Sequence, residues 1–463
     1  MSTSGKHTFH APNITFFTGR ETFLHTLRET LLHKQAATIV GARGVGKTAA
    51  AQEYVRRFAQ QYRRVFWINA ATAETFLCDT LALAWRISLP VDGKLGFANA
   101  LQMVQSWSTN EQDSLLVLDN VTFPQGATIS SAQQLPAGHV VLITHDQDIP
   151  PELPCLKLDA LDEMDGALLV LRRGGLLAPG ATLGQAGHEL RTSALELARM
   201  LQGSPVALNL AGGYIRESRC SVQDYVLAYR DYPTPSDQPD SAGDEQVRSI
   251  EVACGLTLTL LAHRPAAILA LARLCSLLYS DYIPVALFEQ QAAQSRLVAS
   301  AHRQQPISLM RAIQHLQICG LLTVDQDRPF LSMHPLIQAA LRKTFSHKEC
   351  QQRITQLLHA SQQFMLTREG GAQFIRLCVT GHIRRLAAQS EEGALAGDEV
   401  ADALNQAASL LWEQGLIRDA EALVQKALAI WERTPGPTRP EIATAWLNLT
   451  VMNSVLKRYD RAE

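Results

Sequence analysis

The chain has 463 residues, of which 46% are hydrophobic and 19% charged, and its formal net charge is −2 from 42 Lys and Arg against 44 Asp and Glu. This composition predicts a soluble globular protein of about three domains at roughly 150 residues each. The lack of a basic excess disfavours nucleic acid as a main partner. No apolar stretch is long enough to predict a membrane span, and the first twelve residues lack the apolar core of a signal peptide.

From about residue 14 to residue 161, short apolar runs alternate with helical segments. Residues 48–58 predict a helix, because Ala51, Tyr54, Val55 and Phe58 recur at one helical face. Strands that alternate with helices predict a parallel sheet covered on both faces. We expect five strands, at residues 37–40, 65–69, 115–119, 140–144 and 155–158.

Beyond residue 161 the strand signals fade and the chain becomes mainly helical. Helical periodicity continues over residues 247–278, and a helix at 310–322 precedes a predicted hairpin of 322–324 and 330–332. With a further helix at 334–344, this order predicts a winged helix. Earlier helices are expected at 162–173, 186–202 and 205–216, and the Pro-, Ser- and Asp-rich segment Asp231–Asp244 is expected to be a linker.

The last 65 residues contain an internal repeat of 42 residues. Ala403-Leu404 matches Ala445-Trp446, Ile417 matches Tyr459, and Ala420-Glu421 matches Ala462-Glu463. Such a period, with Gly415 at the turn of a helix pair, predicts a TPR-like helical solenoid that binds a protein or peptide. Because one repeat cannot bury its apolar face alone, we expect further repeats beyond the second, incomplete one.

The eight cysteines are scattered through apolar runs and form no C-x-x-C pair. This spacing predicts buried free thiols rather than a disulfide framework or a zinc site, and therefore a reducing cytoplasm. The cysteines are Cys78, Cys155, Cys220, Cys254, Cys275, Cys319, Cys350 and Cys378.

The segment Gly41–Thr48 fits the phosphate-loop pattern G-x-x-x-x-G-K-[ST], with a strand before it and a helix after it. Glycines let the backbone wrap a phosphate, and the exposed amides at the helix start hold the anion. Lys47 would neutralise the β and γ phosphates of ATP or ADP, and the Thr48 hydroxyl would ligate Mg²⁺. The residues predicted to bind the phosphates are Gly44, Val45, Gly46, Lys47, Thr48 and Ala49.

A second motif, the apolar strand that ends in Asp119, would place a carboxylate beside the phosphates as a Mg²⁺ ligand with Thr48. The next residue is Asn120, at a position where many hydrolysing P-loop proteins have a carboxylate. Asn120 can orient a water but cannot accept its proton. Asp119 and, weakly, Asn120 are therefore the catalytic candidates, and we expect a slow ATPase at most.

The order of these motifs resembles the STAND nucleotide switches of the NB-ARC type, which include apoptosome ATPases, plant resistance proteins and many bacterial regulators. Phe16–Glu21 resembles the opening motif of that family, which implies that Phe17 and Arg20 line the adenine side of the pocket. Gly203–Pro205 resembles the family's G-x-P motif, which implies that Pro205 packs on the adenine. Residues 65–70 resemble its second strand and are expected to be core.

Met333-His334-Pro335 resembles the family's Met-His-Asp motif, with proline in place of the aspartate. The resemblance implies that His334 contacts the β phosphate of ADP and holds the closed state. The strand at 140–144 is followed by His145 and Asp146, where many relatives carry an arginine. The resemblance therefore does not imply sensing of the γ phosphate through this strand.

The resemblance implies seven segments. These are an N-terminal extension (1–15), too short for an effector domain, a P-loop nucleotide-binding domain (16–161), a small helical domain (162–235), a linker (236–246), a winged-helix domain (247–345), a helical linker domain (346–398) and TPR-like repeats (399–463).

The implied function is an ATP- or ADP-dependent signalling switch, in bacterial signalling or defence. ADP would hold it closed, and nucleotide exchange triggered through the repeats would open it for self-association. One alternative is a winged-helix transcription regulator, but its helices carry only Arg311, His315, Arg342 and Lys343 as cationic or titratable groups, which is too little charge for a DNA face. A second alternative, a turnover ATPase, is disfavoured by Asn120 and the missing arginine. We expect neither DNA nor a membrane as a partner.

Overall fold

A computed structural model describes residues 7–8, 16–86, 99, 102–103, 113–122, 138–146, 148–233, 244–293, 308–325, 329–366, 372–390, 397–433 and 440–456. Most of the linker predicted at 236–246 lies outside these residues. So do Tyr459, Ala462 and Glu463 of the predicted second repeat.

A parallel sheet forms the N-terminal part, with strand order β1-β3-β4-β5-β2-β6. The five predicted strands are confirmed, and a two-residue strand, β1, adds an edge that the sequence did not predict. The strands are β1 (His7–Thr8), β2 (Ala36–Val40), β3 (Arg64–Asn69), β4 (Ser114–Val121), β5 (His139–Thr144) and β6 (Cys155–Lys157).

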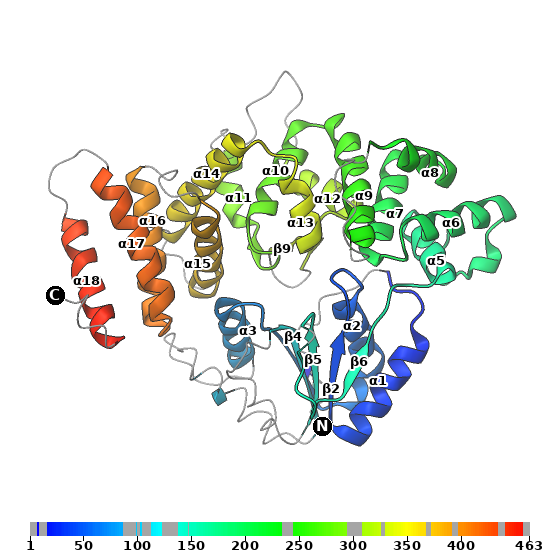
Figure 1. Cartoon of the computed structure of the whole chain (residues 1–463), viewed down its shortest axis with the longest axis horizontal. Helices are drawn as coiled ribbons and strands as arrows, with labels where there is room; N and C mark the ends of the chain where they lie inside the picture. The colour runs from blue at the N-terminus through cyan, green and yellow to red at the C-terminus, as the bar shows by residue number, and fades with distance from the viewer. Residues whose placement is uncertain are drawn as a thin grey trace, which may run out of the picture.

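Helices α1 (Glu21–Lys34) and α2 (Lys47–Phe58) cover one face of the sheet, and α3 (Ala73–Arg86) covers the other (Figure 1). Successive strand side chains point to opposite faces. Trp67 of β3 accordingly packs in the cluster of α1 and α2, and its neighbour Phe66 packs with α3. The α3 cluster also contains Phe330 and Leu377, so later parts of the chain pack directly against this domain.

Four helices follow the sheet. Three of them begin after side-chain caps at Asp162, Ser204 and Ser221, which accept backbone N–H groups of the first turn, and the fourth follows Gly187, which has no side-chain cap. The helices are α5 (Glu163–Arg173), α6 (His188–Met200), α7 (Pro205–Ser218) and α8 (Val222–Asp231), with 3₁₀ turns at Ala59–Gln61 and Leu183–Gln185.

The next unit combines helices with a three-stranded antiparallel sheet of order β7-β9-β8. The predicted hairpin is present, and β7 is a third strand too short for its pattern to predict. The predicted helical stretch 247–278 is two helices, because Pro265 has no backbone N–H and caps the second. The elements are α9 (Asp244–Ala262), α10 (Ala266–Leu277), β7 (Ile283–Pro284), α11 (Ala286–Ala293), α12 (Leu309–Ile318), β8 (Thr323–Val324), β9 (Phe330–Ser332) and α13 (Pro335–Arg342). The helices predicted before and after the hairpin are α12 and α13, so the order of elements on which the winged-helix prediction rested is present.

Five helices end the described chain: α14 (His347–Leu366), α15 (Ala372–Gln389), α16 (Asp398–Glu413), α17 (Ile417–Arg433) and α18 (Pro440–Val455). Gly415, with φ of 77°, makes the turn between α16 and α17. Ala403, Ala420 and Ala427 are fully buried at this helix pair, which lets the two backbones approach closely. One continuous buried cluster runs from α5 to α18, and α15 lies between the repeat helices and α3 (Figure 1).

Among the described residues, no helix combines the length and the apolar character needed to cross a membrane. All eight cysteines are free thiols, and five of them are buried as predicted. Cys155 is exposed, because it lies on the short edge strand β6.

Candidate functional site

The loop Gly41–Thr48 joins β2 to α2 at the carboxyl edge of the parallel sheet. Gly44 and Gly46 have φ of 81° and 91°, in the region that side-chain-bearing residues disfavour. Helix α2 begins at Lys47, so the amides of its first turn have no partner within the helix. This is the geometry of an anion site at a helix N-terminus, with the glycines that a phosphate loop requires.

Lys47 lies over the loop. Its Nζ donates to the backbone oxygens of Gly41 at 2.7 Å and Ala42 at 2.9 Å. Burial, with a smaller contribution from Arg43, lowers the pKa of Lys47 to about 8, and Asp119 opposes this shift. An anion beside this ammonium would stabilise its charged form. The lysine therefore fits a phosphate.

Thr48 and Asp119 meet at the end of β4. The Thr48 hydroxyl donates to Asp119 Oδ1 at 3.1 Å. Burial raises the pKa of Asp119 to about 7, and nearby Asp281 adds to the rise. A divalent cation would favour the ionised carboxylate, so this pair fits Mg²⁺. Within the described residues, no group of three or more His, Cys, Asp or Glu side chains could hold a metal.

Asn120 has a left-handed backbone, with φ of 60°. Its amide N–H donates to Asp119 Oδ1 at 3.0 Å, and its Nδ2 donates to Asn69 Oδ1 at 3.4 Å. The residue therefore braces the ends of β3 and β4. It provides no group that could take a proton from water.

Arg20 reaches the loop from the segment before α1. Its Nη2 donates to the Val45 carbonyl at 2.7 Å. Burial lowers the pKa of Arg20, and Asp165 and Asp159 oppose this shift. The same segment presses closely on α5, since a Cβ on Gly19 would lie 1.6 Å from Asp165 Oδ2.

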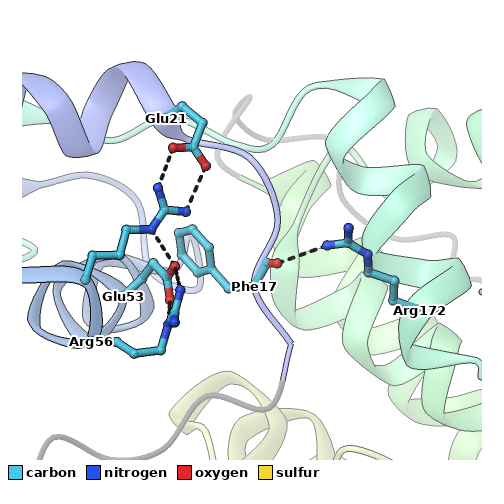
Figure 2. Close-up of polar contacts among 6 residues, drawn as sticks. Phe17, Glu21, Glu53, Arg56 and Arg172 are labelled. Carbon is cyan, nitrogen blue, oxygen red and sulfur yellow. Dashed lines mark hydrogen bonds and ion pairs between the residues drawn. The ribbon is translucent and has the colours of Figure 1, made fainter. Parts of the chain in front are cut away.

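Phe17 lies between α2 and α5 (Figure 2). On the α5 side its carbonyl accepts from Arg172 Nη1 at 3.4 Å. On the α2 side lies a charged network in which Arg56 Nε donates to Glu53 at 2.7 Å and Arg57 Nη2 donates to Glu21 at 2.8 Å. The opening segment thus joins the sheet domain to the small helical unit.

Pro205 also lies at the loop: its Cγ is 3.6 Å from the position that a Cβ on Gly46 would take. A Cβ on Gly44 would lie 3.0 Å from Leu336 Cδ1 of α13, 3.4 Å from Val206 of α7 and 3.6 Å from Ile250 of α9. Three helices distant in the sequence therefore pack on the phosphate loop.

His334 caps α13, and its Nδ1 accepts the N–H of Leu336 at 3.2 Å. This assigns the proton of the neutral ring to Nε2. Burial lowers the pKa of His334 to about 4, with Lys47 and Arg43 adding to the shift. His334 therefore lies among the loop cations as a neutral donor.

The sequence reasoning missed several polar residues near the loop. Arg43 of the loop donates to His145 Nε2 at 3.0 Å. Its guanidinium therefore lies beside His145, the residue after β5 that stands where an arginine was expected from the resemblance. Asn69, expected to be core, donates from Nδ2 to Asp281 Oδ2 at 3.2 Å. Its position after an apolar strand, like that of Asp119, was the available signal.

Asp79 makes a further contact between the sheet domain and the segment that precedes β7. Asp79 of α3 accepts the Asn69 amide at 2.8 Å and the Tyr282 hydroxyl at 2.6 Å. Residues 281 and 282 precede β7, more than 200 residues away from Asp79 in the chain. Sequence patterns carry no sign of that pairing.

Comparisons with known proteins agree with this architecture. A family model described as "Tetratricopeptide repeat" matches residues 399–463, and one described as "Domain of unknown function (DUF7779)" matches residues 261–350. The TPR-like character of the C-terminal region is thereby confirmed. A comparison with curated proteins finds no match.

Among solved structures, the chain is similar to a STAND (Signal Transduction ATPase with Numerous Domains) protein with a tetratricopeptide repeat sensor from Pyrococcus horikoshii. The TM-score is 0.50 at 13% identity, over 97% of this chain and 63% of that one. The chain thus spans about 63% of the length of that protein. It is also similar to a Walker-type ATPase of Pyrococcus abyssi (TM-score 0.34, 14% identity, 70% of this chain and 96% of that one) and to the ORC2 protein of Aeropyrum pernix (TM-score 0.33, 13% identity, 72% and 95%). The chain therefore has the fold of a P-loop ATPase with a helical, TPR-like C-terminal region.

Proposed function

We propose that the chain is an adenine-nucleotide-dependent switch of the NB-ARC type, held closed by ADP. The observation that carries the proposal is the packing of α7, α9 and α13 on the phosphate loop at Gly44. A nucleotide bound there would lie beside groups of the sheet domain and of α7, α9 and α13. Its exchange would therefore change the contacts that hold those parts together.

In this proposal, Lys47 and the loop amides hold the phosphates, and Thr48 and Asp119 hold Mg²⁺. Phe17 and Arg20 line the adenine side, and Pro205 packs on the base. The Nε2–H of His334 donates to the β phosphate, because its Nδ1 is already occupied by the Leu336 amide. Gly44, Val45, Gly46 and Ala49 contribute backbone N–H groups, and Asn120 limits the protein to slow hydrolysis at most.

Opening would require a ligand that prefers the open arrangement, because only differential affinity shifts an equilibrium. The TPR-like repeats are the surface where a protein or peptide would bind. In the ATP state the winged-helix unit would move away from the loop, and the sheet domains would self-associate, in bacterial signalling or defence. The seven segments predicted from the sequence would be the moving units.

The winged helix supports this internal role better than the DNA-binding alternative. His315 of α12 lies 3.0 Å from Glu217 of α7, and Arg173 donates to the Gln317 carbonyl at the end of α12 at 2.8 Å. Arg342 donates to the Ser276 carbonyl at 2.6 Å. Two of the four groups considered for a DNA face, His315 and Arg342, are therefore engaged within the protein.

The decisive experiment is to denature the purified protein and identify the released nucleotide. We expect about one ADP per chain, and none from Lys47→Ala, because that ammonium neutralises the phosphates. Lys34→Ala, at the exposed end of α1, is the matched control and should retain ADP. If wild-type protein releases no adenine nucleotide and binds none on titration, the proposal is wrong.

A further inference from the structure

One arginine of α15 contacts both the sheet domain and the repeats. Arg384 Nη2 donates to Glu74 Oε2 of α3 at 2.9 Å, and Nη1 pairs with Asp419 Oδ1 of α17 at 3.0 Å. Helix α15 lies between these two helices (Figure 1). A single guanidinium therefore joins the first predicted repeat to the domain that carries the phosphate loop.

The two ends of this bridge differ in burial. The Glu74 side chain is 1% exposed, that of Arg384 is 24% exposed and that of Asp419 is 39% exposed. Glu74 Oε1 is buried and has no hydrogen-bond partner among the described residues. A carboxylate in this position depends on its cation, because an unpaired buried charge is strongly destabilising. The planar guanidinium can serve two carboxylates at once, which a lysine cannot do with the same geometry.

Helix α15 also hydrogen-bonds the segment 279–282, which extends to the strand ends beside Asp119. His382 Nδ1 accepts the Tyr279 amide at 3.1 Å, and its Nε2 donates to the Tyr282 carbonyl at 2.9 Å. Between these two residues is Asp281, which accepts from Asn69. Asn69 is paired with Asp119 in the β3–β4 register. A shift of α15 would therefore reach both α3 and the surroundings of Asp119.

We propose that Arg384 couples the repeats to the nucleotide site. Asp419 holds the guanidinium against Glu74, and a ligand that moves α17 withdraws this carboxylate. The contact of α15 with α3 then weakens, and with it the hold on the nucleotide. This inference rests on the proposed function, since it states how the repeats act on ADP retention.

The same interface contains a native reporter of its opening. The sulfurs of Cys78 on α3 and Cys378 on α15 are 3.1 Å apart and buried. A disulfide would require them to approach to about 2.05 Å. The oxidant diamide would accept the two electrons and two protons that the thiols lose as the S–S bond forms. Because buried thiols react slowly, the rate of this reaction would report how often the interface opens, with or without nucleotide.

The test compares full-length variants by two rates: release of a fluorescent ADP analogue, and diamide-driven formation of the Cys78–Cys378 disulfide by peptide mapping. Glu74→Gln should raise ADP release about tenfold, which corresponds to about 1.4 kcal/mol. Asp419→Asn should raise it about threefold, since the more exposed pair is weaker. The double variant should match Glu74→Gln alone, because both changes act through one guanidinium.

Two controls accompany these variants. Arg418→Gln removes the positive charge of an exposed residue next to Asp419 and should leave both rates unchanged. Arg384→Lys keeps the positive charge but loses the planar guanidinium that pairs with two carboxylates. It should release ADP at a rate between those of wild type and Glu74→Gln. Circular dichroism checks that each variant is folded, and Cys378→Ser should give no intramolecular product.

Two results would overturn the coupling. One is an approximately thirtyfold effect in the double variant, which would mean two independent contacts. The other is an Asp419→Asn variant whose ADP release and disulfide formation both equal those of wild type. If wild-type protein binds no adenine nucleotide, the proposed function fails. The disulfide rates, which need no nucleotide, would still decide whether Asp419 acts on the α3–α15 interface.

Discussion

His382 is a buried histidine that remains neutral, so the folded chain should lose stability as the pH falls. Its side chain is 1% exposed. Burial, with a smaller contribution from Arg385, lowers its pKa to about 4, and the hydrogen bond to the Tyr282 carbonyl opposes this shift. The unfolded chain binds this proton near pH 6.5. The folded chain binds it only near pH 4.

The sign follows from proton uptake. Between pH 6.5 and pH 4 the unfolded state binds more protons than the folded state, so acid favours unfolding. The contribution of His382 is fully present above about pH 6.5. From the two pKa values, about 2 kcal/mol is lost at pH 5 and about 3 kcal/mol below pH 4.

The assay is urea unfolding at pH 7.5 and pH 5.0, for wild type and for His382→Gln, which is neutral at both pH values. Hydrogen exchange of α15 amides identifies the transition to follow, because a chain of several domains does not unfold in one step. Wild type should lose about 2 kcal/mol more than the variant on acidification. His263→Gln, an exposed histidine, should behave as wild type. An equal acid loss in wild type and His382→Gln would refute the assignment of a buried neutral imidazole.

Three other changes test the phosphate loop and its surroundings. His334→Ala should raise spontaneous ADP release, measured by displacement of a fluorescent analogue. Unchanged release would show that His334 does not retain ADP. Gly44→Ala should weaken nucleotide binding in calorimetric titration, because φ of 81° and a Cβ 3.0 Å from Leu336 Cδ1 both oppose a side chain there. Wild-type affinity would contradict that packing. Gly203→Ala should destabilise the chain by about 2 kcal/mol or more in thermal unfolding, since its Cβ would lie 2.0 Å from the backbone oxygen of Leu161. Gly175→Ala, with φ of 73° and nothing within 4 Å, carries only the backbone cost, and equal losses in the two variants would refute the clash.

Much of the fold was predictable because its signals are local. The strands of the parallel sheet are short apolar runs, and the phosphate loop is a contiguous pattern between a strand and a helix. Asp119 was found in the same way, at the end of one strand. The small strands β1 and β7 have two residues each, which is too short for a periodic signal.

The sequence by itself determined the strand, loop and helix that contain the phosphate-loop pattern, because its glycines, Lys47 and Thr48 are contiguous in the chain. Only the tertiary structure decided that the buried Asn69 hydrogen-bonds Asp281, that His334 and His382 stay neutral, and that Arg384 joins Glu74 to Asp419. Burial and charge pairing depend on residues that lie hundreds of positions apart. The periodicity of one segment cannot show which distant side chain will pair with a charged residue in that segment.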